Sequence, residues 1–535
     1  MAGVCLEPGR TQWAVSVSSG LPRRATRPAG LAILARRRGG VSRATGDQGG
    51  PVGVGGSSDE AWDGAGLDRQ IMDLAVPALG ALALDPLLGL VDTGWVGRLE
   101  SGPSDLAGLG AGLAVFAFTF RIFNFLTAVT GPLVAQEVAQ GDAEAARQTV
   151  GGAVGLALVL GAVSAGLLIG FRDPIVALVA GGDQAALGVE ATARDYLAVR
   201  ACALPAVLIS NVGVGAYRGL LDTQTPLKIA VLANVLNFAL DPVLIFGVPA
   251  LHVPAFGVAG AAGATVVSEC VAAAAYVALL VSVRPAADRT SGMADEEPLL
   301  RVGDIVRVPG PGTLAPLLAG GASQIARTLS LQVFLVSAVS AAVRMDPVSG
   351  LPAAAYQIAL QAYNTLLYAL DALAVPAQGL VASALGLGDV RKARRAADRL
   401  LQLGALSGIV LAILVWAGHN IIPSLLTDDA DVAALAGPLL VAVALLQPIN
   451  GLVFVGDGIL QGATDFTYLA YAMGLAVALS LLTLEQGIVP LNDSLAGIWA
   501  VVALLQVLRA AGLAARYYDL VPGSPLQLPV SVGDE

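Results

Sequence analysis

The sequence predicts an all-α polytopic membrane protein, built as twelve transmembrane helices in two pseudo-symmetric six-helix bundles around a central cavity. Three observations lead to this prediction: the composition, the number of apolar segments and an internal repeat. Of the 535 residues, 56% are hydrophobic and only 13% are charged. A soluble domain carries about 25% charged residues, so this chain lacks the polar surface that water requires.

Twelve apolar segments follow residue 70, each bounded by glycine, proline or charged residues. A membrane-spanning helix needs about 20 predominantly apolar residues, and most of these segments are long enough to span with some tilt. The first six lie near 71–97, 106–139, 148–171, 191–217, 226–247 and 257–283. The second six lie near 313–343, 353–386, 400–423, 432–461, 467–490 and 495–518.

Two pairs of similar stretches indicate an internal duplication. GPLVAQEVAQGDAEAARQ at 131–148 aligns with QGLVASALGLGDVRKARR at 378–395, a shift of 247 residues. RGLLDTQTP at 218–226 aligns with QGATDFTYL at 461–469, a shift of 243. One match would be weak in a chain rich in Ala, Gly and Leu, but two in the same order at nearly one shift argue for duplication. Parallel six-helix repeats imply a pseudo-two-fold axis along the membrane normal and a central cavity.

Polar stretches divide the chain into five parts. Residues 1–45 hold eight arginines and one acid, Glu7, and the Gly-rich run GDQGGPVGVGGSSDE follows. An Arg-rich, Ser-containing and acid-poor start is typical of an organelle transit peptide, and a disordered cytosolic tail is the alternative. The predicted parts are a transit peptide or disordered tail at 1–66, an N-terminal six-helix bundle at 67–284, a polar linker at 285–312, a C-terminal six-helix bundle at 313–520 and a C-terminal tail at 521–535.

The sequence carries no motif for enzymatic chemistry or for a resident metal. Cys5, Cys202 and Cys270 form neither a metal-ligand spacing nor a disulfide framework. The net charge of −10 is not gathered in one patch and gives no indication of nucleic-acid binding. We therefore expect no cofactor, no enzymatic activity and no nucleic-acid partner. A membrane-embedded enzyme stays as the alternative from another class.

Several stretches in combination resemble the multidrug and toxic compound extrusion (MATE) transporter family. They are DPLLGLVDTGWVGRL in the first predicted helix, AYRGLLDTQTPLKIAVLANVLNFALDPVLIFG across the fourth and fifth, GVAGAAGATVVSE in the sixth and INGLVFVGDGILQGATDF in the tenth. The resemblance extends over about 70–519 and points to the branch similar to DNA-damage-inducible protein F and to plant organellar and citrate-exporting members. It implies an antiporter that exports an organic solute, such as citrate or an aromatic acid, coupled to H⁺ or Na⁺. A lipid-linked sugar flippase of the same superfamily is the alternative within transport.

Acidic and amide residues inside the predicted helices are the candidate coupling site. A carboxylate near a bilayer centre costs roughly 2.5–3.5 kcal/mol on insertion scales, so its presence indicates a function. Asp85 and Asp92 are seven residues apart and share one helix face, as do Asn237 and Asp241, four residues apart. The resemblance implies that Asp92, Asn237 and Asp241 bind the coupling cation, H⁺ or Na⁺, with Thr265 as a fourth residue. The alternative is a polar cluster that only holds the bundle together.

Other polar residues inside the helices are candidates for the substrate cavity. Arg121 and Asn124 lie midway along the second predicted helix, where Arg121 would suit an anionic substrate or pair with Asp85. Asp371 in the eighth helix and Asp457 in the tenth would bring acids to the cavity from the second bundle. Together with Asp85, these four residues complete the cavity candidates. Apart from a possible Na⁺ at the coupling site, no metal is expected.

The placement of positive charge predicts the topology. Lys and Arg gather in alternate loops, most densely as Arg391, Lys392, Arg394, Arg395 and Arg399, and so both termini are expected on one cytoplasm-like side. The expected partners are a small organic solute and the lipid bilayer, and a monomer is expected. With the Arg-rich start, this predicts a multi-pass integral protein of an organelle membrane. The chloroplast envelope is favoured over the mitochondrion, and the plasma membrane is the alternative.

Overall fold

The computed structural model describes residues 64–99, 103–180, 187–284, 298–301, 303–304, 310–346, 348–485 and 494–527. The predicted tails and the predicted linker fall largely outside these ranges, so the five-part division of the chain stays a prediction. The side chains of Asp85 and Asp92 also lie outside the described part, and only their helical backbone is considered below.

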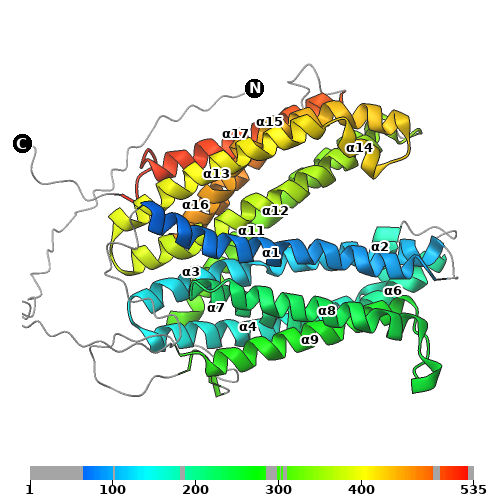
Figure 1. The fold of residues 1–535 in the computed structure, drawn as a ribbon, viewed down its shortest axis with the longest axis horizontal. Helices are drawn as coiled ribbons and strands as arrows, with labels where there is room; N and C mark the ends of the chain where they lie inside the picture. Colours follow the sequence, from blue (N-terminus) through cyan, green and yellow to red (C-terminus); the bar gives the residue numbers. More distant parts are fainter. Residues whose placement is uncertain are drawn as a thin grey trace, which may run out of the picture. The chain divides into compact units, whose positions relative to one another are not determined.

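The described residues are almost entirely α-helical (Figure 1). The helices of the first half are α1 (Gly64–Val96), α2 (Pro103–Phe123), α3 (Phe125–Ala139), α4 (Ala143–Gly170), α5 (Arg172–Ala180), α6 (Leu187–Ala201), α7 (Leu204–Gly219), α8 (Gln224–Phe246), the short 3₁₀ helix η3 (Pro249–Leu251) and α9 (Val258–Ser282). Those of the second half are α11 (Pro311–Met345), α12 (Leu351–Gly386), α13 (Val390–Gly418), α14 (Ile421–Leu426), α15 (Ala430–Gly462), α16 (Phe466–Glu485) and α17 (Leu495–Tyr517).

The helices account for the twelve predicted membrane spans. Ten spans in the described part are long and apolar enough to cross a membrane, with α2 and α3 counted as one. The pair α6 and α7, bent by 53°, forms an eleventh. The helix α1 is 33 residues long and contains an apolar run over 74–91 in which Asp85 is the one charged residue, which makes it the twelfth. The predicted all-α polytopic fold is confirmed.

The structure adds breaks that the apolar pattern alone does not show. The segment predicted near 191–217 is interrupted at Cys202 and Ala203, and Pro205 stands in the first turn of α7. Because proline lacks an N–H donor and its ring crowds the preceding turn, a helix cannot run through this point undisturbed. The segment predicted near 106–139 is interrupted at Asn124 for one residue only, between α2 and α3.

The internal duplication is visible in single backbone angles. Gly141 and Gly388, 247 residues apart, end α3 and α12 with φ angles of 76° and 72°. Leu221 and Thr464, 243 residues apart, both have a φ of 57°, which is uncommon for a residue with a side chain. The aspartate after each of the two glycines caps the next helix, accepting a bond from the N–H three residues on at 2.9 and 3.0 Å. These are the two shifts of the sequence repeat, so the two halves share one backbone design.

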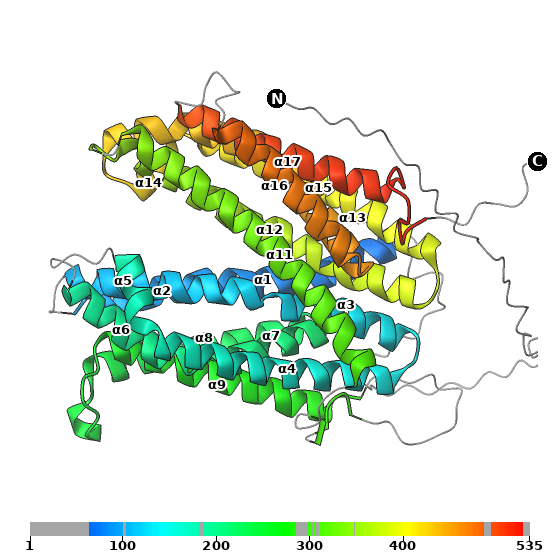
Figure 2. The same cartoon turned by 180° about the vertical axis from the view of Figure 1, so that it is seen from behind.

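The helix α11 connects the two halves (Figure 2). It contacts α2, α3 and α4 of the first half as well as α12, α16 and α17 of the second. Just before it, Leu299 and Leu300 are fully buried in the core of the first half, and Asp304 accepts two bonds from Arg147 of α4, at 2.9 and 3.0 Å. The described part of the predicted linker is therefore docked on the first half.

Helices α13 and α15 pack with their backbones in direct contact. A Cβ atom at Gly451 would overlap the carbonyl oxygen of Gly404, and one at Gly408 would overlap that of Gln447. Small residues at such points let two membrane helices approach closely, which gives van der Waals contact where no hydrophobic effect drives association.

We expect Gly451→Val to destabilise the protein by more than about 3 kcal/mol, because the added atoms meet backbone rather than a movable side chain. Gly474→Val in α16 is the matched control, since a Cβ atom there meets nothing within 4 Å. The measurement is the yield of monodisperse protein and its melting temperature in detergent. Equal melting temperatures for the two variants would contradict the close packing of α13 on α15.

Candidate functional site

Three of the four predicted coupling residues meet inside the first half. Asn237 and Asp241 of α8 are 0% exposed, and Thr265 of α9 is 1% exposed. In the amide orientation that satisfies its neighbours, Asn237 donates to Oδ2 of Asp241 at 3.1 Å and accepts from the Thr265 hydroxyl at 3.2 Å. The four-residue spacing on α8 therefore does place amide and carboxylate together. Their oxygens form a site that could hold a proton or a Na⁺ ion.

The fourth residue, Asp92, lies on α1, whose backbone runs alongside α8. The Thr223 hydroxyl, just before α8, donates to the carbonyl of Leu74 at 2.8 Å. Towards the other end, the ring of Trp95 lies 6.0 Å from that of Phe238. Phe238 follows Asn237 directly, and Asp92 precedes Trp95 by about one helical turn. The course of α1 thus brings the backbone at position 92 to the level of the amide–carboxylate cluster.

One face of α12 is polar over three turns. Its members, at spacings of three and four residues, are Gln361, Asn364, Thr365, Tyr368 and Asp371. Gln361, Thr365 and Tyr368 are exposed, although α12 is a membrane span. Polar groups in contact with lipid hydrocarbon would be costly, so we expect this exposed polar face to contact water rather than lipid. We call these five residues the α12 polar face.

The second half contains a buried charge cluster. Arg509 of α17 donates to Oδ2 of Asp457 of α15 at 2.6 Å, and Arg327 of α11 donates to the same oxygen. The side chains of Arg509 and Asp457 are only 7% and 9% exposed, whereas that of Arg327 is 18% exposed. We call these three residues the C-half charge cluster.

Neutral polar residues extend this cluster deeper into the second half. Arg509 also donates to the side-chain oxygen of Gln506 at 2.7 Å. The Gln506 amide in turn donates to the Tyr363 hydroxyl at 2.6 Å and to Asn450 at 2.7 Å. The network joins α11, α12, α15 and α17, so it fixes the relative positions of four helices as well as the orientation of the two arginines.

The structure places the remaining cavity candidates at different sites. Asp457 joins the C-half charge cluster, and Asp371 is half-buried on the α12 polar face. Arg121 and Asn124 are exposed, and Arg121 bonds Gln332 of α11 at 3.0 Å. The predicted pairing of Arg121 with Asp85 stays a prediction, because the Asp85 side chain is not described.

Sequence reasoning missed Arg327, Arg509 and the neutral residues that extend the cluster. Two signals were present in the chain. The first is the polar spacing over 361–371, and the second is an arginine near the middle of an apolar segment, as at Arg327. An intramembrane ionisable residue is by default a functional candidate.

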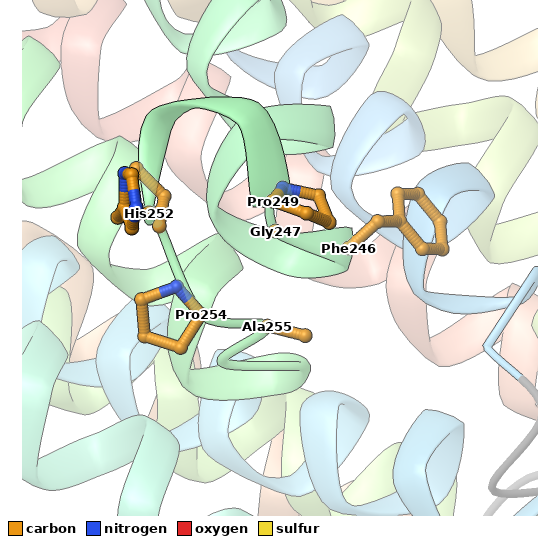
Figure 3. A pocket seen from close by; sticks show the side chains of 7 residues that line it. Phe246, Gly247, Pro249, His252, Pro254 and Ala255 are labelled. Atoms are coloured by element: carbon orange, nitrogen blue, oxygen red, sulfur yellow. The ribbon is translucent and has the colours of Figure 1, made fainter.

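One open hollow in the described surface lies away from all these residues. It is formed by the α8–α9 connection, where Val248 and Val253 make an isolated β-bridge (Figure 3). Its lining consists of Phe246, Gly247, Pro249, His252, Val253, Pro254 and Ala255. None of these belongs to the coupling residues or to the C-half charge cluster, and we assign the hollow no role. In the part of the chain that is described, no group of three His, Cys, Asp or Glu side chains is placed to hold a metal ion.

At one end of the helices, the two halves are bound together. Arg399 of α13 bonds both carboxylate oxygens of Asp68 of α1, each at 2.6 Å. A second contact joins other helices of the two halves: the Gln136 amide of α3 donates to the Gly462 carbonyl of α15 at 3.1 Å. A Cβ atom at Gly386 of α12 would clash with the Gln136 backbone, so helices of the two halves touch directly here.

A polytopic fold with a buried amide–carboxylate cluster, a buried charge cluster and an exposed polar helix face is typical of a membrane transporter. The family model MatE matches residues 77–243 and 328–484, one stretch in each half and together more than half of the chain. The chain belongs to the MatE family of transporters.

Individual relatives agree with this assignment. Protein DETOXIFICATION 44, chloroplastic, of Arabidopsis thaliana is 34% identical over 466 residues, which cover 84% of this chain and 82% of that protein. DNA damage-inducible protein F of Escherichia coli is 30% identical over 463 residues, covering 84% of this chain and 91% of that protein. The predicted resemblance is confirmed.

Solved structures share the fold at lower identity. A MOP superfamily transporter from Pyrococcus furiosus matches with a TM-score of 0.72 at 19% identity, over 85% of this chain and 97% of that one. A multidrug resistance MATE family transporter in an outward-facing conformation matches with a TM-score of 0.71 at 19% identity, over 83% and 94%.

The Asp68–Arg399 pair makes a testable contact between the halves. Arg399→Asp should lower transport about fivefold, because it replaces a partly exposed ion pair between the halves with the repulsion of two carboxylates. The exchange Asp68→Arg with Arg399→Asp should recover most of the loss. Initial rates of transport in reconstituted vesicles measure both. If the exchanged pair is no better than the single variant, this contact does not join the halves during transport.

Proposed function

We propose that this protein is an antiporter that exports an organic solute by alternating access of its two halves, coupled to H⁺ or Na⁺. The observation that carries the proposal is the burial of Asp241 and Asn237, both 0% exposed within a membrane-spanning helix. A carboxylate at such a place is costly as an anion unless a cation accompanies it. Binding and release of that cation, as the two halves move, would connect the ion gradient to the solute.

The coupling site in this proposal consists of Asp92, Asn237, Asp241 and Thr265. Three of these residues contact one another in the described structure, and the backbone of α1 passes beside them. Carboxylate, amide and hydroxyl oxygens are suitable ligands for Na⁺, and a carboxylate can equally take a proton. If the cluster only stabilises the bundle, the variants below should transport normally whenever they fold.

The solute that we propose is a carboxylate, such as citrate or an aromatic acid. Arginines inside the membrane support this choice: Arg121 is exposed on α2, and Arg327 and Arg509 lie in the second half. Relatives named for multidrug resistance favour solute export over the flippase and enzyme alternatives.

We expect Asp241→Asn to lower gradient-driven transport at least about tenfold, because an amide neither takes up a proton in this range nor contributes charge to a Na⁺ site. The protein should still fold, since a neutral amide is easier to bury than a carboxylate. Asp92→Asn should behave alike, and the double variant should be little worse than either, because residues that act as one unit are non-additive. The assay is uptake into vesicles under an imposed pH or Na⁺ gradient.

The matched control is Ser480→Ala in α16, which lies 243 residues after Asn237 and so at its equivalent in the repeat. Ser480 is also 0% exposed, but its hydroxyl bonds only the carbonyl of Ala476 in its own helix, at 2.8 Å, among the described contacts. It should transport normally. Full transport by well-folded Asp241→Asn would leave the structural cluster as the better reading.

We also propose that the protein resides in an organelle membrane, with the chloroplast envelope favoured. The Arg-rich, acid-poor start supports an organelle address, and the relative that is 34% identical bears the word chloroplastic in its name. A fluorescent protein fused to residues 1–70 should therefore enter an organelle, and microscopy with plastid and mitochondrial markers should show which one. Uniform cytosolic fluorescence would contradict the targeting proposal and leave the transport proposal untouched.

A further inference from the structure

The C-half charge cluster has an uneven balance of charge. Two guanidinium groups, of Arg327 and Arg509, bond a single oxygen of Asp457. An arginine paired with a carboxylate commonly forms two parallel N–H···O bonds, one to each oxygen. Neither arginine does so here. Both therefore keep donors for a second anionic group.

The unused donors lie inside the protein. The Nε atoms of Arg327 and Arg509 are buried and have no hydrogen-bond partner among the residues that the structure describes. A buried donor left unsatisfied costs about 1–3 kcal/mol, and more when the group is charged. The C-half charge cluster thus places two arginines on one acid at membrane depth, where surplus charge is costly.

Access to the cluster is one-sided. Arg509 and Asp457 are almost fully buried, whereas the side chain of Arg327 is 18% exposed. The helix α11, which carries Arg327, packs against α12, which carries the α12 polar face. A solute that reaches the cluster would therefore meet Arg327 first, because the side chain of Arg327 is the more exposed of the two arginines.

We propose that Arg327 and Arg509 form the binding site for a carboxylate of the transported solute. Asp457 is the internal carboxylate that holds Arg327 when no solute is bound, and the solute displaces it. A carboxylate is the group that the site already accommodates, in the form of Asp457, and a guanidinium matches its planar geometry. The assignment rests on the proposed export function, because it names the substrate class of that same transporter.

The proposal predicts opposite effects on solute binding for two substitutions, whereas loss of a purely structural ion pair would not strengthen binding. Arg327→Gln removes the first contact of the solute and should weaken its binding about tenfold or more. Asp457→Asn removes the competing internal carboxylate and should tighten binding several-fold. Arg344→Gln, an exposed arginine in the last turn of the same helix, is the matched control and should change nothing.

The experiment is calorimetric titration of the purified full-length protein with citrate and with benzoate, followed by phosphate and chloride. We expect citrate or benzoate to bind the wild-type chain, with the two opposite shifts in the variants and weaker binding of phosphate and chloride. Weaker binding in Asp457→Asn would indicate a structural pair and overturn the proposal. Equal binding in Arg327→Gln and wild type, or no carboxylate binding at all, would also overturn it. Phosphate or chloride binding as tight as that of the carboxylates would overturn the substrate class.

This titration needs no ion gradient, so it separates the two proposals. If the carboxylate binds as forecast but no gradient drives its transport, the site stands and the export function fails. If a pH or Na⁺ gradient drives export of another solute and Arg327→Gln changes neither binding nor rate, the export function stands and the site fails. Melting temperatures of the variants, compared with Arg344→Gln, confirm that each tested protein is folded.

Discussion

A carboxylate inside a membrane must be compensated, and the two halves of this protein compensate theirs differently. In the first half, Asp241 accepts a bond from the neutral amide of Asn237, with the neutral hydroxyl of Thr265 beside it. In the second half, Asp457 is bonded by two arginines. Amide and hydroxyl groups beside a carboxylate suit the binding of a cation, whereas two arginines that share one carboxylate oxygen suit the binding of an anion. On our proposals, one half serves the coupling ion and the other serves the solute.

The duplication explains how one backbone design carries both chemistries. The turns after α3 and α12 agree in backbone angle and helix cap, as do the turns before α8 and α16 in the angles of Leu221 and Thr464. The side chains that matter have diverged on this common frame. At the shift of 247, Asn124 corresponds to Asp371, and at 243, Asn237 corresponds to Ser480. The turns position the helices, and the polar side chains in the middle of the helices differ between the halves.

Much of the fold follows from the sequence because a membrane imposes one length scale and one polarity on every helix. The predicted span near 226–247 coincides within two residues with α8, and the Asn237–Asp241 spacing sufficed to predict their contact. The break before α7 was not predicted, although Pro205 in the first turn of α7 and Arg200 in the last turn of α6 are signals for it. Arg327 and Arg509 are far apart in sequence, and no local pattern tells a paired buried arginine from one that reaches to the membrane surface. Their convergence on Asp457 depends on the packing of α11, α15 and α17, which only the structure provides.

The central claim is that the ion and the solute are bound in different halves. The most direct test measures cation binding and carboxylate binding on the same purified preparations of Asp241→Asn and Arg327→Gln. Cation binding is followed by radioactive Na⁺ or by proton release, and carboxylate binding by titration with citrate or benzoate. We expect Asp241→Asn to lose cation binding and still to bind the carboxylate, and Arg327→Gln to lose carboxylate binding and still to bind the cation. Loss of both ligands in either folded variant would contradict the separation of the two sites.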